Sequence, residues 1–436
     1  MGETFLGLLF MLAGVATWVA IFRRTGDALH PLALLASLWL LTFGFGHWEV
    51  AATYDELYYR EPFGAVAYLA VIGSLVSVVA GFWLVDPGLR PLEREALAER
   101  LRSNARRGRL LAITLALFAV ASATTVYFVW LAGEVPLFSP RVDELRQTFK
   151  RPLLGYLYDL HFPVALFAAI LADRATRRSE RVFWIGLLLA SLFQLALGAV
   201  RASPLTGFGW VAVYLFYRLR GRVRVGHLSA AAVVVAGVFI GIEYSRRTPV
   251  RLNPELLNPR QDLSSAATLW GHTGASFKNL QLTLRTTPPP LEMGAATYDL
   301  PKTLVPRFRE IESDVSSRFG VHNSATYLLP LWLDFGLFGL LVVPGIYGAL
   351  TGFTYRRFQE RGTLLWLLLY IDFAIAAILA FRTHKFLGNG LIFFGGVALM
   401  VQLFAGREPD DVAEDRGQVG EGAPAPAPGA VVGAAR

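Results

Sequence analysis

The chain has 436 residues, of which 54% are hydrophobic and only 17% are charged, whereas ordinary soluble domains are less apolar and about a quarter charged. There is no cysteine, which excludes disulfides, thiolate metal sites and cysteine nucleophiles. The formal charge of +8 could suggest nucleic acid binding, but arginines in the loops of a membrane protein explain it more simply.

Long apolar runs recur from the N-terminus to about residue 405, and they are long enough to cross roughly 30 Å of hydrocarbon. The runs lack two-residue alternation, which argues against a β-barrel and predicts an all-α polytopic membrane protein. The first run has no basic residue before it and no cleavage signature after it, so we expect a retained helix. The predicted spans are 4–22, 29–47, 64–85, 110–132, 160–173, 182–200, 203–217, 227–243, 324–354, 362–381 and 387–405.

Arginines gather in alternate loops of this pattern. Five such loops hold 20 of the 41 Lys and Arg residues, and cytoplasmic loops of membrane proteins carry an excess of these residues. The pattern predicts about eleven transmembrane helices, with the N-terminus outside and the C-terminus inside. Residues 1–405 then form one transmembrane domain with a long extracytoplasmic loop at about 244–321. Residues 406–436 are acidic and then rich in Ala, Pro and Gly, which predicts a disordered cytoplasmic tail.

Basic residues also occur in the predicted outer segments, where topology does not explain them. Arg146 lies in the loop after the fourth span, and Arg382 lies in the connection before the last span. Arg201, Arg246 and Arg247 stand directly at predicted helix ends. An ionisable group near hydrocarbon is costly unless it faces a polar cavity or an anionic partner, and the arginine fork suits phosphate oxygens.

A histidine stands where the long outer loop enters the ninth span. His322 and Asn323 are followed by Tyr327 and by two glycines three residues apart, Gly336 and Gly339. A lone histidine is usually structural, and such glycines allow close helix packing. A neutral imidazole at the mouth of a basic cavity can also remove a proton from a sugar hydroxyl, which makes His322 a candidate general base.

Four segments in this order carry a resemblance to a known family. They are VPLFSPRVDELRQTF, GAVRASPLTGFGWV, the long loop that begins with Arg246-Arg247, and HNSATYLLPLWLDFGLFGLL. Together they resemble the O-antigen and oligosaccharide repeat-unit polymerases of the Wzy type and, more distantly, the O-antigen ligases. The resemblance covers most of residues 130–405. The distance from the His-Asn pair to the Gly-x-x-Gly step favours a polymerase over a ligase.

This resemblance implies a GT-C-like membrane glycosyltransferase that uses no metal and no cofactor. It would move a growing glycan from undecaprenyl pyrophosphate onto a new lipid-linked repeat unit, at the outer face of the bacterial inner membrane. His322 would act as the base, oriented by Asn323, and the expected substrate-binding residues are Arg201, Arg246, Arg247, Arg146, Arg382 and Tyr327. Its partners would be the lipid-linked glycan, membrane lipid and a polysaccharide chain-length regulator, with no nucleic acid.

Three alternatives stay open at the level of sequence. A ligase that attaches finished glycan to another acceptor uses the same chemistry. A transporter or flippase requires internal symmetry and polar residues deep in several helices, whereas Gln194 and Asp372 are the main polar residues within the predicted spans. A structural or assembly protein would use the long outer loop, with its Pro- and Thr-rich stretch 286–290, as a binding surface.

Overall fold

The structure is a computed structural model, and it describes residues 2–48, 61–139, 154–198, 202–219, 273–287, 326–381 and 389–407, with a few single residues between these ranges. Within these ranges the elements are helical, and an isolated antiparallel bridge joins Ala105 to Gly406. The predicted all-α fold class is therefore confirmed for this part of the chain. The extent of the tail after Arg407 lies outside the described residues and stays a prediction.

Ten of the eleven predicted spans coincide with helices of the structure, because long apolar runs satisfy their backbone polar groups internally. These helices are α1 (Gly2–Thr25), α2 (Pro31–Gly46), α4 (Ala65–Val85), α6 (Arg107–Ala132), α9 (His161–Arg174), α10 (Arg178–Leu197), α11 (Ala202–Arg218), α17 (Val343–Arg361), α18 (Leu364–Leu379) and α19 (Asn389–Ala405). The shorter elements are α5 (Arg94–Ser103), η2 (Pro136–Phe138), α8 (Leu154–Asp159), α14 (Gly274–Thr286) and α16 (Leu328–Leu341).

The lengths and compositions of these helices are those of a multi-pass membrane protein. Among the described residues, five helical runs are long and apolar enough to cross a membrane, or six if the bent pair α16–α17 is one span. The helices α2, α18 and α19 are apolar but shorter. The predicted eighth span, 227–243, lies outside the described residues, so the count of eleven and the length of the outer loop stay predictions.

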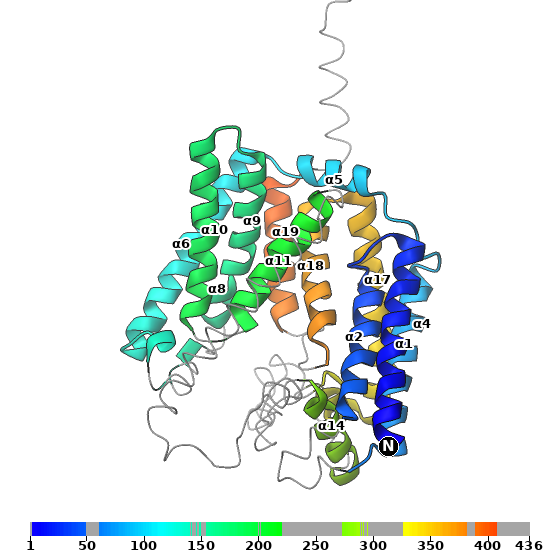
Figure 1. Ribbon diagram of the computed structural model, residues 1–436. Coiled ribbons are helices and arrows are strands. Elements are labelled where there is room, and N and C mark those ends of the chain that lie inside the picture. Colours follow the sequence, from blue (N-terminus) through cyan, green and yellow to red (C-terminus); the bar gives the residue numbers. More distant parts are fainter. Residues whose placement is uncertain are drawn as a thin grey trace, which may run out of the picture.

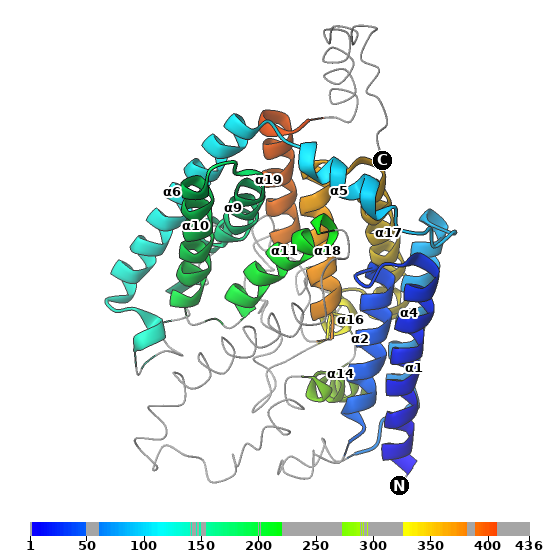
Figure 2. The same ribbon diagram turned by 45° about the horizontal axis from the view of Figure 1, so that its top comes forward.

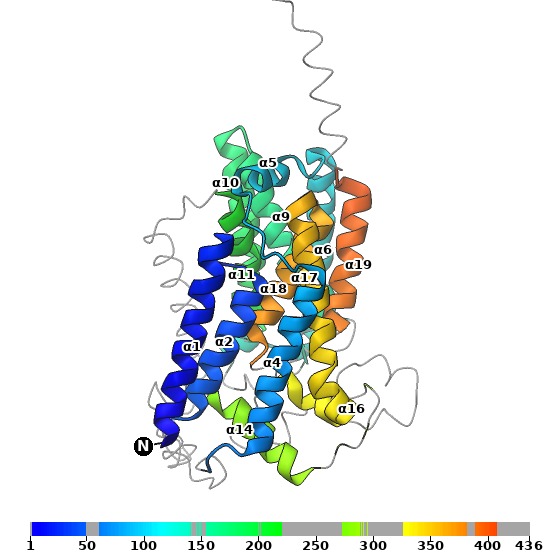
Figure 3. The ribbon, with the colours of Figure 1, turned by 90° about the vertical axis from the view of Figure 1, so that its right-hand side faces the viewer.

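The helices pack into one bundle. The helices α1, α2, α4 and α17 lie together on one side, α6, α9 and α10 lie on the other, and α11, α18 and α19 lie between them (Figures 1 and 3). Helix α5 crosses one end of the bundle, and α14 lies at the opposite end beside the N-terminus (Figure 2). We call the α5 end the inner end and the α14 end the outer end, since the predicted topology assigns them to those sides.

Glycines line the contact between α4 and α17. A Cβ atom on Gly81 would overlap the carbonyl oxygen of Gly345, and one on Gly348 would overlap the carbonyl oxygen of Val78. The two backbones therefore touch, as small residues permit in membrane helix pairs. Only glycine fits at these two positions of the seam.

The predicted ninth span is two helices, with α16 bent by 73° from α17. Inside α16, Gly336 has φ 58° and ψ −136°, a conformation that glycine adopts and other residues avoid. A Cβ atom there would also lie 3.3 Å from the ring of Pro289. The sequence associated Gly336 and Gly339 with close helix packing. The structure instead shows Gly336 at an interruption of the helix.

A buried carboxyl group holds the inner end together. Asp27, in the connection between α1 and α2, is fully buried and accepts hydrogen bonds from the hydroxyls of Tyr217, at 2.8 Å, and Tyr355. The hydroxyls of Tyr217 and Tyr370 are 2.7 Å apart, and Tyr370 donates to the carbonyl oxygen of Leu29 at 2.8 Å. Burial raises the pKa of Asp27, while the tyrosine hydroxyls act in the opposite direction. The cluster joins α11, α17 and α18 to the α1–α2 connection.

Candidate functional site

The structure describes one of the eight residues predicted to form the site, Tyr327. The other seven, which are His322, Asn323, Arg146, Arg201, Arg246, Arg247 and Arg382, lie outside the described residues. Residues on either side of several of these positions are described. Their contacts show which of the predicted segments approach one another at the outer end.

The start of α16 is hydrogen-bonded to the end of α18. The backbone N–H of Tyr327 donates to the carbonyl oxygen of Ala380 at 3.0 Å. Asn323 precedes Tyr327 by four residues, and Arg382 follows Ala380 by two. The described ends of the chain that lead to these two predicted residues therefore meet.

A second contact joins the segment after η2 to the outer end of α10. A Cβ atom on Gly198 would lie 3.1 Å from the ring of Phe149 and 3.2 Å from the hydroxyl of Tyr158, so these groups are packed against the glycine. The rings of Phe149 and Tyr158 are 5.3 Å apart. Phe149 follows Arg146 by three residues and Gly198 precedes Arg201 by three, so the segments that carry these two arginines also approach each other.

A third contact connects these two places. The rings of Tyr156, in α8, and Phe393, in α19, are stacked with their centroids 5.4 Å apart. The segment that contains Arg382 therefore leaves α18 beside Tyr327 and enters α19 beside α8. A continuous set of contacts thus runs along the outer end from α16 through α18, α19 and α8 to α10.

Polar side chains lie buried beneath this part of the outer end. His161, the first residue of α9, is fully buried, and its Nε2 lies 3.2 Å from the hydroxyl of Thr125 on α6. Gln194 of α10 donates to the hydroxyl of Ser122 at 3.1 Å, and its backbone carbonyl accepts from the hydroxyl of Tyr158 at 2.8 Å. Polar groups among membrane helices pair with one another, and here they fix α6, α9 and α10 together.

Sequence reasoning missed this role of His161. Its partner Thr125 is 36 residues away in the chain, and no local motif connects the two. The signal that could have been used is the presence of a histidine inside a short apolar span, because such a residue needs a partner.

Tyr327 packs into the core below the start of α16. Its side chain is 2% exposed, and its ring centroid lies 5.0 Å from that of Trp39 in α2. Trp39 in turn contacts Phe277 of α14 at 4.9 Å between centroids. Aromatic pairs at these distances stabilise a core beyond the burial of their area. The described contacts of Tyr327 are therefore those of a core residue that packs the start of α16 against α2, and its predicted contact with substrate stays a prediction.

Helix α14, within the predicted long outer loop, is clamped to the segment before α4. The side chain of Gln281 accepts from the backbone N–H of Gly64 at 2.8 Å and donates to the carbonyl oxygen of Pro62 at 3.0 Å. Lys278 donates to the carbonyl oxygen of Glu61. Sequence reasoning did not predict this helix, because polar residues interrupt its apolar ones and leave no long apolar run; several of these polar side chains, such as Lys278 and Gln281, are themselves buried.

Two titratable groups beside this clamp have shifted pKa values. Lys278 is 5% exposed and its ammonium lies 4.0 Å above the ring of Phe63; burial lowers its pKa to about 8. His47, which follows α2, has its Nε2 at 2.8 Å from the hydroxyl of Tyr68, and burial lowers its pKa to about 4. At neutral pH the imidazole of His47 is therefore uncharged while Lys278 is mostly charged.

The described part of the outer end is thus a frame of packed and hydrogen-bonded helix ends. Arg146, Arg201, Arg382 and His322 lie within a few residues of it in sequence, whereas Arg246 and Arg247 lie far from any described residue. Within the described ranges, no three His, Asp or Glu side chains gather as a metal site requires.

Comparison with models of protein families finds that the O-antigen polymerase family matches residues 52–381, which is more than half of the chain. Seven of the eight predicted site residues lie within the match, and Arg382 lies one residue beyond it. A search of curated proteins and a search of solved structures found no match.

Proposed function

Because the chain belongs to the O-antigen polymerase family, we propose that it joins undecaprenyl-pyrophosphate-linked repeat units into O-antigen or exopolysaccharide at the outer face of the bacterial inner membrane. The family makes it a glycosyltransferase-type polymerase, and the apolar helices make it a multi-pass membrane protein. The observation that carries the proposal is the family match, which includes all four segments of the resemblance in their order.

The contacts at the outer end support the location of the reaction. Tyr327 and Ala380, which lie four and two residues from Asn323 and Arg382, are hydrogen-bonded to each other. Phe149 and Gly198, each three residues from Arg146 and Arg201, are packed together. The α8–α19 contact joins the two pairs. A lipid-linked substrate whose polyprenyl chain lies between apolar helices would present its pyrophosphate at this level of the membrane.

In the proposed reaction, the bond between the anomeric carbon of the growing glycan and its phosphate oxygen breaks, and undecaprenyl pyrophosphate leaves. A hydroxyl oxygen of the incoming repeat unit forms the new glycosidic bond. Negative charge develops on the leaving pyrophosphate, and groups fixed in place beforehand stabilise such charge best. We assign this role to Arg201, Arg246 and Arg247, with Arg146 and Arg382 in support, so that arginines supply the charge that a metal ion supplies elsewhere.

The proton of the attacking hydroxyl needs an acceptor. His322 is the proposed base, with Asn323 as the group that orients its ring. The proton moves from the hydroxyl to the imidazole as the new bond forms, and it then passes to water. A chain-length regulator stays an expected partner on the ground of the family resemblance alone.

The test is reconstitution of the purified protein in proteoliposomes with a lipid-linked repeat unit, followed by sizing of the glycan. His322→Ala should lower the rate of chain extension by about 100-fold or more, since a positioned general base contributes about 10²–10⁴-fold. His227→Ala, at the predicted inner end of the eighth span, is the matched histidine control and should extend chains normally. Polymer of normal length from the His322 variant would remove this residue as the base.

A second arm of the same assay separates charge from geometry. Arg201→Lys keeps the charge but loses the two-pronged contact with phosphate oxygens, so we expect slower extension; Arg178→Lys at the inner end is the control. Deletion of this protein from its host, followed by sizing of the glycan, distinguishes a ligase. If polymer still forms and only its attachment is lost, the protein is a ligase and the polymerase proposal is wrong.

A further inference from the structure

The last described residues of the chain are fastened to the inner end of the bundle. The backbone N–H of Arg106 donates to the carbonyl oxygen of Ala405 at 2.7 Å, and that of Arg407 donates to the carbonyl oxygen of Asn104 at 3.0 Å. These bonds fix the end of α19 against the corner between α5 and α6. Whatever follows Arg407 therefore starts from a fixed point on the inner surface.

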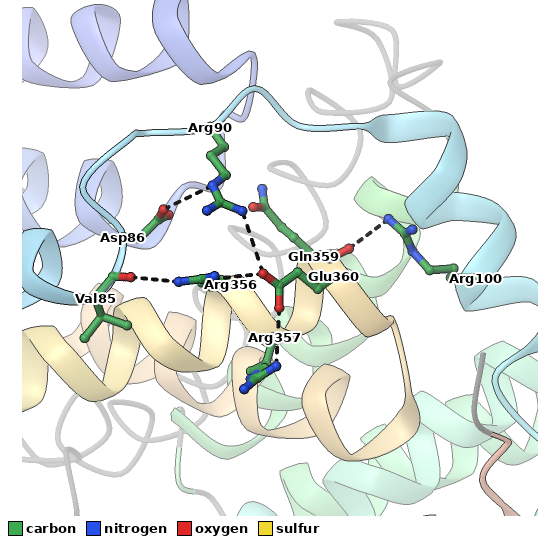
Figure 4. Close-up of polar contacts among 8 residues, drawn as sticks. All are labelled: Val85, Asp86, Arg90, Arg100, Arg356, Arg357, Gln359 and Glu360. Carbon is green, nitrogen blue, oxygen red and sulfur yellow. Dashed lines mark hydrogen bonds and ion pairs between the residues drawn. The ribbon is translucent and has the colours of Figure 1, made fainter. Parts of the chain in front are cut away.

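The basic residues of this inner surface form two groups, and one of them is supplied with carboxylates. Arg90 lies 4.0 Å from Asp86 and 3.7 Å from Glu360 (Figure 4). Glu360 also binds Arg356 at 2.8 Å and Arg357 at 3.5 Å. At the corner between α4 and α17, the charges of the arginines are thus shared among nearby acids.

The second group lies where α19 ends, around the starts of α6 and α10, which are joined by an ion pair between Arg107 and Glu180. Glu180 is the one carboxylate in the turn 176–182, which also contains three arginines. Arginine side chains at the start of a helix add to the positive end of its dipole and are locally unfavourable. We call the exposed arginines of this corner the arginine surface, and they are Arg102, Arg106, Arg109, Arg177, Arg178 and Arg181.

The chain that follows Arg407 has the complementary charge. Residues 408–415 read EPDDVAED and contain five carboxylates and no basic residue. Fully extended, eight residues reach about 26–29 Å. That length is enough to pass from the end of α19 across the starts of α6 and α10, since these elements contact one another.

We propose that the acidic segment 408–415 docks on the arginine surface and forms an electrostatic clasp between the tail and the helix bundle. Exposed ion pairs are individually weak, so the clasp depends on several of them together and on salt. Because the segment is covalently attached beside the surface, its effective concentration there is high without any tight contact. Once docked, it covers arginines that would otherwise attract the anionic headgroups of the inner leaflet.

The absence of cysteine makes a direct test possible. Ser179→Cys, on the exposed first turn of α10, and Val412→Cys, in the acidic segment, would carry a pair of spin labels on the full chain in zwitterionic lipid nanodiscs. We expect a narrow population at short distance in about 0.1 M salt, where charges act over about 10 Å. The population should disperse in about 1 M salt, where that range falls to about 3 Å. It should also disperse when Asp410, Asp411, Glu414 and Asp415 are changed to their amides.

Charge reversal on the surface provides the matched pair of variants. Arg177→Glu with Arg178→Glu should release the segment, and Arg178→Glu keeps the helix because a carboxylate suits the start of α10. Arg23→Glu with Arg24→Glu reverses two exposed arginines at the end of α1 and should leave the distance unchanged.

Two outcomes would overturn the proposal. The first is a broad distance distribution that neither the amide variant nor salt changes. The second is a distribution that is broad in zwitterionic discs while the arginine variants lose bound anionic lipid, which would assign the surface to the membrane.

Discussion

Lys278 is a charged side chain in a place with little water. Burial lowers its pKa to about 8 from 10.5, while in the unfolded chain the amine keeps the ordinary value. Below pH 8 both states are protonated, and the cost of burying the ammonium is fully present. Between pH 8 and 10.5 the unfolded state binds more protons than the folded state, so the free energy of unfolding rises with pH. A shift of this size corresponds to on the order of 3 kcal/mol.

We therefore expect the apparent Tm of the purified protein to gain a few degrees between pH 8 and pH 10 through this group. Lys278→Met removes the titration, and its Tm should lack this part of the rise. Arg285→Met, on the same helix but exposed, is the control and should keep it. The difference between the two variants isolates Lys278 from other groups that titrate in this range. Identical profiles for both variants would contradict the assignment.

The buried position of Tyr327 gives a second expectation at this scale. Tyr327→Ala would leave a cavity against Trp39, and truncating a large buried aromatic side chain costs about 3–5 kcal/mol. Tyr327→Phe keeps the packing and loses one hydrogen bond, with Ser74, worth about 1 kcal/mol. Thermal unfolding and the polymer assay should show a destabilised Ala variant and a stable, active Phe variant. A Phe variant that folds normally but makes no polymer would point to a direct role for the hydroxyl.

The sequence was enough to predict candidate residues, but not the residues that they contact. The arginines at predicted helix ends and His322 stand out by charge and position alone. The hydrogen bond from Lys278 joins residues 217 apart in the chain, and the contact of His161 joins residues 36 apart. No periodicity or motif brings such pairs together. They become visible only when the helices are packed.

Among the helices, the α4–α17 pair gives the sharpest prediction. Gly81→Val places a branched side chain against the carbonyl of Gly345, and the two backbones must separate to accept it. We expect a loss of several kcal/mol and a large fall in the yield of folded protein, as for severe overpacking. Gly186→Val on α10, where a Cβ atom meets nothing within 4 Å, is the matched control and should behave as the unmodified chain does. Measurement is by size-exclusion chromatography and thermal unfolding in detergent.

Hydropathy predicted the apolar helices to within a few residues and failed where a helix is short, amphipathic or bent. Helix α14 was missed because polar residues alternate with its apolar ones and leave no continuous apolar run, although side chains such as Lys278 and Gln281 are buried. The break between α16 and α17 and the interruption of α16 at Gly336 were both missed because apolar residues continue through them, and hydropathy does not report backbone angles. Length and composition determine that a helix forms, whereas packing determines where the helix bends or ends.

For the molecule as a whole, the orientation in the membrane is open to a direct measurement. Phe138, which ends η2, is 73% exposed at the outer end, and Thr176 is exposed at the inner end between α9 and α10. In the cysteine-free chain, Phe138→Cys should react with an impermeant maleimide added to intact cells. Thr176→Cys should react only after the membrane is opened. The reverse pattern would invert the predicted topology.

The buried carboxyl of Asp27 also has a consequence for the way the chain is made. Its partner Tyr217 is synthesised 190 residues later, and Tyr355 follows 328 residues after Asp27. At roughly 5–20 residues per second, synthesis of the 328 residues from Asp27 to Tyr355 takes about 16–66 s. During that time the connection between α1 and α2 lacks the hydroxyl of Tyr355. The cluster around Asp27 at the inner end is therefore completed late in synthesis, when α17 and α18 supply Tyr355 and Tyr370 to a connection made near the beginning.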